Sequence, residues 1–137
     1  RIEENALGNL GDLLLLQGEL DSAESYLLDA IEICDDVWPA AAGGFRGSLA
    51  IIRAKNGDFD AARSLIAKGE GLTRGVHAVE FGKILCRRVH VEHLAGGSKE
   101  VIEDTMTKAM ALADQIQAGP NSELGTAIAD MRGMVGR

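Results

Sequence analysis

The side chains best suited to chemistry in this 137-residue chain are one cysteine and two histidines. Cys86, His90 and His93 stand at i, i+4 and i+7, a spacing that places them on one face of a helix. Thiolate and imidazole are zinc ligands, so a zinc site is one hypothesis. A tetrahedral site needs a further ligand, and the chain has no second Cys/His cluster and only one other histidine, His77. We therefore expect packing roles for these residues and no metal, with zinc as the alternative.

Other patterns associated with catalysis are incomplete. Adjacent carboxylates at 3–4, 35–36 and 103–104 point about 100° apart on a helix, so they do not share a site. The glycine-rich segment 43–48 lacks the lysine of a phosphate-binding loop and follows no strand. No serine stands in a nucleophile-elbow context. We therefore expect no enzymatic activity and no cofactor.

Composition and charge restrict the class of protein. The chain is 46% hydrophobic, which is typical of one folded domain, and its net charge of -7 disfavours binding to a nucleic-acid backbone. No apolar run approaches the ~20 residues of a membrane helix, so we expect no membrane partner. Two cysteines and no visible signal peptide predict a cytoplasmic protein. The first residue is Arg1 and not Met, and we expect the chain to be a fragment of a longer protein.

Charge is distributed unevenly along the chain. The net charge is -9 over residues 1–37, +4 over residues 38–100 and -2 over residues 101–137. Segments of opposite charge could orient a partner or pair two copies as a homodimer, and apolar end faces are a second route to a dimer. The alternative is that both charged surfaces are only solvated.

Apolar residues recur at helical spacing along nearly the whole chain, and no segment alternates like a strand. Glycines and two prolines, Pro39 and Pro120, interrupt the pattern. The sequence thus predicts an all-α fold. The predicted helices cover residues 3–17, 20–34, 39–56, 59–72, 77–95, 99–116 and 122–135.

A short motif recurs at a regular interval. Residues 17–23 (QGELDSA) return as residues 56–62 (NGDFDAA) and, degenerately, as residues 96–102. The key glycines, Gly18, Gly57 and Gly97, are 39 and 40 residues apart. Such a period indicates a solenoid of stacked helix pairs.

Each residue type in the motif has a mechanical role. Glycine ends the first helix of a pair because it takes a left-handed conformation at little cost. We expect Asp21 and Asp60 to cap the second helix and Ala23 and Ala62 to allow close approach of the two helices.

The motif resembles the tetratricopeptide repeat, or TPR. The period exceeds the usual 34 residues, as in longer repeats of bacterial signalling and transcription regulators and of the kinesin light chain. The resemblance implies one TPR-like domain over residues 1–137. It would be a right-handed α-solenoid of about three antiparallel helix pairs (4–37, 39–75 and 77–116) and a terminal helix (122–135). The matching residues are Leu10, Gly11, Leu14, Gly18, Ala23, Leu27 and Ala30 in the first repeat, and Leu49, Ala50, Gly57, Ala62, Ile66 and Gly69 in the second.

The resemblance also implies a function, namely binding of a protein or peptide in a concave groove without a cofactor. The first helix of each pair would line that groove. The groove residues, which we expect to be exposed, are Asn5, Asp12, Leu15, Leu16, Ile51, Lys55, Ile84, Arg87 and Val91. The alternative hypothesis is a ligand- or peptide-sensing regulatory domain of a larger bacterial signalling or transcription regulator.

Two departures from the family pattern refine this expectation. Gly8 and Asp12 replace the residues with which some TPR domains hold a carboxylate, and Asp12 would repel one. Gly43, Gly44 and Gly47 lie inside a predicted helix, where each costs about 1 kcal/mol relative to alanine. We expect a close neighbour there, with a flexible ligand site as the alternative. Trp38 is expected to pack at the junction of the first two pairs, with contact to a partner as the alternative.

Overall fold

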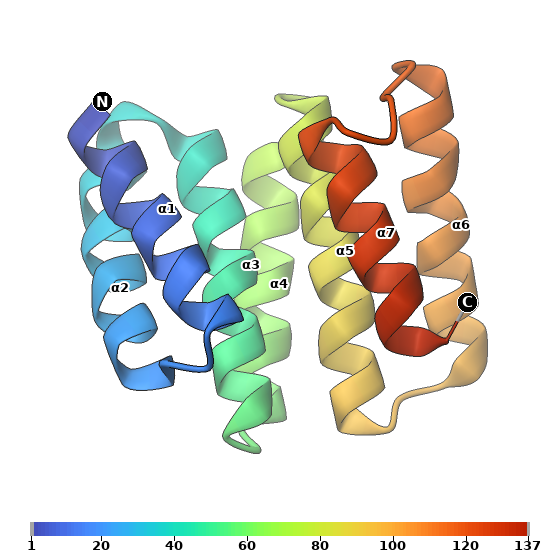
Figure 1. Ribbon diagram of the computed structural model, residues 1–137, viewed down its shortest axis with the longest axis horizontal. Coiled ribbons are helices and arrows are strands. Elements are labelled where there is room, and N and C mark those ends of the chain that lie inside the picture. The colour runs from blue at the N-terminus through green and yellow to red at the C-terminus, as the bar shows by residue number, and fades with distance from the viewer. Residues whose placement is uncertain (1, 137) are drawn as a thin grey trace.

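Figure 1 shows a computed structural model that describes residues 2–136, without the side chains of residues 2–5 and 7. The described residues form seven α-helices and no strand, which confirms the predicted all-α fold. The largest difference in a helix end is at α2, which continues to Val37 instead of ending at residue 34. The helices are α1 (Ile2–Leu16), α2 (Leu20–Val37), α3 (Pro39–Lys55), α4 (Phe59–Thr73), α5 (Ala78–Ala95), α6 (Lys99–Gln115) and α7 (Glu123–Val135).

Left-handed glycines follow the odd-numbered helices. Gly18, Gly57, Gly96 and Gly136 have φ angles of 79°, 83°, 69° and 78°. Residues with a Cβ are strained in this conformation, so glycine stops each helix and redirects the chain. The third glycine of the series is Gly96 and not Gly97, which corrects the sequence prediction. The structural intervals are therefore 39, 39 and 40 residues.

The predicted caps were wrong for the second helices. The N-cap of α4 is Asp58, whose Oδ1 accepts a hydrogen bond from the Ala61 amide at 3.2 Å. Asp60 lies one residue inside the helix, and Asp21 occupies the same place in α2. A capping oxygen must come from the residue before the first helical one, so these two acids only complement the positive end of the helix dipole.

Successive helices form pairs that pack in chain order (Figure 1). The pairs α1–α2, α3–α4 and α5–α6 each pack together, and α1, α3, α5 and α7 contact one another in that succession. Within the described residues, helix contacts join only members of the same pair or of adjacent pairs. The fold is therefore repeat-like. None of the described helices is long and apolar enough to cross a membrane.

Bulky residues of one pair fit against glycines of the preceding pair. The ring of Phe45 occupies the position that a Cβ on Gly8 would take. A Cβ on Gly47 would lie 2.6 Å from Ile84 Cδ1. Phe45 and Ile84 are both buried, so the glycines make room for core side chains. Close packing at the α3 glycines, including Gly43 against Thr73 of α4, is confirmed.

Candidate binding groove

Two neighbouring cavities lie along the odd-numbered helices. The first has a volume of about 290 Å³ and is lined by residues of α1, α3, α5 and the start of α7. The second has a volume of about 490 Å³ and lies mainly between α5 and α7, with Leu16 from the end of α1. Lys83, Arg87 and Glu123 line both cavities, which are therefore parts of one depression.

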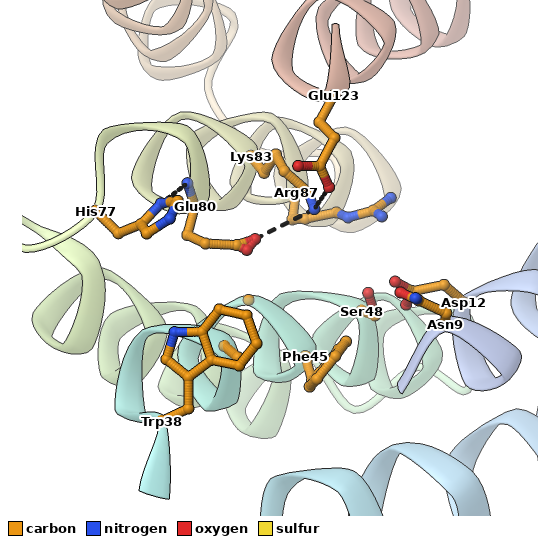
Figure 2. Close-up of a pocket in the computed structure, with 12 residues that line it drawn as sticks. Asn9, Asp12, Trp38, Phe45, Ser48, His77, Glu80, Lys83, Arg87 and Glu123 are labelled. Carbon is orange, nitrogen blue, oxygen red and sulfur yellow. Dashed lines mark hydrogen bonds and ion pairs between the residues drawn. The ribbon is translucent and has the colours of Figure 1, made fainter. Parts of the chain in front are cut away.

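Figure 2 shows two facing walls in the first cavity. One wall comes from α5 and the residue that caps it, and Glu123 of α7 joins it. The other wall is α3 with Trp38 at its N-cap, and α1 closes one end. The labelled lining residues are His77, Glu80, Lys83, Arg87 and Glu123 on the first wall, Trp38, Phe45 and Ser48 on the second, and Asn9 and Asp12 from α1.

Lys83 is held between two carboxylates at the boundary of the cavities. Its Nζ lies 3.2 Å from Glu80 Oε1 and 3.3 Å from Glu123 Oε1 (Figure 2). Burial lowers the pKa of Lys83, but attraction by Glu80, Glu123 and Asp12 outweighs it, so the net pKa is raised. The ammonium group is thus charged at neutral pH, and its charge is compensated within the protein.

Arg87 is the cation in the groove that has no such compensation. It is half-buried and lines both cavities. Among the described residues it forms no ion pair or side-chain hydrogen bond, in contrast to Arg46, Arg53 and Arg63. A guanidinium group presents five N–H donors in a fixed fork, so Arg87 can bind an acidic group of a ligand.

Asp12 places a carboxylate at the α1 end of the first cavity. Its Oδ1 atom is buried and has no hydrogen-bond partner among the described residues. A buried oxygen of this kind is costly unless a donor satisfies it. The groove therefore offers one uncompensated positive group and one undersatisfied negative group.

The second cavity is less polar, and two of its titratable groups, Cys86 and His90, are neutral. Burial raises the pKa of the Cys86 thiol to about 11. Burial, together with the positive charges of Arg87 and Lys55, lowers the pKa of His90 to about 4. Both groups are therefore uncharged at physiological pH. Met131 and Met134 line the opposite wall on α7 and can adapt to an apolar ligand.

The structure separates the expected groove residues into two sets. Asp12, Leu16 and Arg87 line the cavities. Lys55 is exposed at the end of α3 but lines neither cavity. The Asn5 side chain lies outside the described residues.

The other four expected groove residues are in the core, which corrects the prediction that they are exposed. These residues are Leu15, Ile51, Ile84 and Val91, and each is buried. Ser48 and Lys83 line the first cavity, whereas Ile51 and Ile84 belong to the core cluster and line neither cavity.

Several lining residues were not predicted from the sequence. Trp38 packs against the core as expected, but it also lines the first cavity. Lys83, Glu80 and Glu123 were also missed. The available signal was their charge, since Glu80 and Lys83 stand one turn apart before Arg87 on one helix.

The three residues of the cysteine–histidine face differ in their exposure to solvent. Cys86 is buried, His90 is half-buried and His93 is exposed. The described residues contain no group of three or more His, Cys, Asp or Glu side chains that could hold a metal ion.

No model of a known protein family matches this chain, and no curated protein sequence matches it.

Proposed function

We propose that this chain is a non-enzymatic protein- or peptide-binding module, a right-handed TPR-type solenoid with its ligand along the odd-numbered helices. The observation that carries this proposal is the sharing of Lys83, Arg87 and Glu123 by two adjoining cavities. A depression that touches the four odd-numbered helices suits an extended ligand better than a compact one. The packing of each helix only with its own and adjacent pairs supports the solenoid.

The side chains that line the groove indicate which chemical groups the partner should carry. An acidic group of the ligand pairs with Arg87, and an apolar side chain enters the second cavity near Met131 and Met134. A nucleic acid is a poor ligand, because the net charge of the chain is -7.

Selection of peptides from a random display library on the immobilised chain tests this proposal. Fluorescence anisotropy with a selected peptide then gives Kd for the wild type and for Arg87→Glu. Loss of a charge-assisted contact predicts a Kd increase of about 10- to 100-fold. Lys108→Glu is the matched control, because Lys108 is exposed on α6 and lines neither cavity. Equal effects of the two variants, or recovery of no peptide, would refute groove binding.

A second function is favoured by the size of the second cavity. Its volume of about 490 Å³ lies in the range of small-molecule sites, about 300–1,000 Å³. We therefore also propose, as the alternative, a regulatory domain that senses a small ligand in a larger bacterial signalling or transcription regulator. A thermal-shift screen of metabolites separates the two functions. A sensor shows a raised Tm with one compound class, and Ala127→Trp, which fills this cavity, abolishes the shift.

A further inference from the structure

Equivalent positions on the odd-numbered helices have very different exposure. The left-handed glycines set the register, and the residue five positions before each is Leu13, Ile52, Val91 or Met131. Ile52, Val91 and Met131 are 1%, 0% and 3% exposed, whereas Leu13 is 50% exposed. A single exposed leucine is ordinary on a protein surface. Leu13 is notable because the residues at the equivalent position of the other three helices are buried.

A second position shows the same contrast between α1 and α3. The residues eight positions before the glycines are Leu10, Leu49, Arg88 and Ile128. Leu49 is 3% exposed, Arg88 and Ile128 are half-buried, and Leu10 is 38% exposed. Leu10 and Leu13 are three residues apart, so they form one apolar face of α1, here called the α1 face.

The chain itself shows what covers such a face. On α3, Phe45 stands seven residues before Ile52, on the same face, and lies against Gly8 of α1. On α5, Ile84 stands seven residues before Val91 and lies against Gly47 of α3 and Gly69 of α4. The face of α7 packs against α5 and α6. In all three cases the cover is the preceding helix pair, and a glycine of that pair receives the bulky residue Phe45, Ile84 or Leu124.

We propose that the α1 face is an interface between repeats, occupied by a further helix pair of the same type on the N-terminal side of Ile2 in the same polypeptide. The equivalent faces of α3, α5 and α7 are each covered by the preceding helix pair. A further pair packed on α1 would continue this series of three interfaces. Charge favours a basic pair, since residues 1–37 have a net charge of -9. The same charge disfavours a second copy that presents its own α1 face.

The test extends the chain by one pair. A copy of residues 39–77, which has six basic and three acidic residues, is placed before Ile2. Burial of Leu10 and Leu13 by the added pair predicts a Tm about 5 °C or more above that of the original chain, in one cooperative transition. The amide protons of α1 should also exchange more slowly. A second extension with residues 2–38, which have ten acidic and no basic residues, should give a smaller gain because it repels the acidic first pair.

The matched variant is Leu13→Asp in the original α1. In the extended chains this change should remove most of the gain in Tm, whereas in the unextended chain it should have little effect. Absence of a gain in both extensions, or a gain that survives Leu13→Asp, would overturn the proposal. Sedimentation velocity of the unextended chain tests the other occupant. A dimer that Leu13→Asp dissociates would assign the face to a second copy.

Discussion

Two glycines of α4, two residues apart, should respond to alanine with opposite signs. A Cβ on Gly69 would lie 2.7 Å from Ile84 Cδ1 and 2.8 Å from the carbonyl oxygen of Gly43. A Cβ on Gly71 would meet no atom within 4 Å. Both glycines are helical, so the intrinsic gain from alanine is similar at the two sites.

The expected magnitudes follow from these distances. Alanine gains about 0.5–1 kcal/mol over glycine in a helix interior. At Gly71 this gain stands alone, so Gly71→Ala should stabilise the chain by about that amount. At Gly69 the carbonyl of Gly43 belongs to the backbone of α3 and cannot rotate away. Overpacking costs about 1–3 kcal/mol, so Gly69→Ala should be destabilising by about 1–2 kcal/mol net.

Urea denaturation followed by circular dichroism measures both variants. For a chain of this length a difference of about 2–3 kcal/mol corresponds to roughly 5–10 °C in Tm. Equal m-values would show that the unfolded states are comparable. If Gly69→Ala proves as stable as Gly71→Ala, the close approach of α3 and α4 at Gly43 is wrong, and with it the explanation for the glycines inside α3.

Three further predictions concern ionisable groups. The pKa of His90 is lowered to about 4 by burial, below the ordinary 6.5, so the unfolded chain binds more protons between these values. The free energy of unfolding, measured by urea titration, should fall as pH drops from about 6.5 to 4. His90→Gln should reduce this dependence on pH. An unchanged dependence would contradict burial of the imidazole. The Cys86 thiol is buried and its pKa is raised to about 11, so at pH 8 it should react with a disulfide reagent much more slowly in the folded chain than in the unfolded chain. The Cys86→Ser variant identifies which part of the reaction belongs to Cys86. The hydrogen bond from Arg46 holds the pKa of Asp35 below its usual range. Asp35→Asn should therefore cost at most about 1 kcal/mol above pH 5, an effect that disappears at lower pH or in high salt; a larger, salt-independent loss would show a packing role instead.

Local sequence determined the helices of this protein. Apolar spacing and stop residues were sufficient for all seven, because a helix depends on residues within about four positions. Gly18 and Gly57 were recognised for the same reason, since a left-handed residue is needed where each helix ends. The prediction that Gly97 is the left-handed residue was wrong, since Gly96 has that conformation. With two adjacent glycines, the loop geometry decides which of them is left-handed.

Only the tertiary structure decided which residues face the groove. Ile51 and Ile84 belong to helices that were predicted correctly, yet both are buried against neighbouring pairs. Glu123 reaches Lys83 from a position 40 residues further along the chain. Leu13 is exposed although its equivalent, Ile52, is buried. Helix formation is governed by neighbours along the chain, whereas exposure is governed by neighbours in space, and these depend on how the pairs pack.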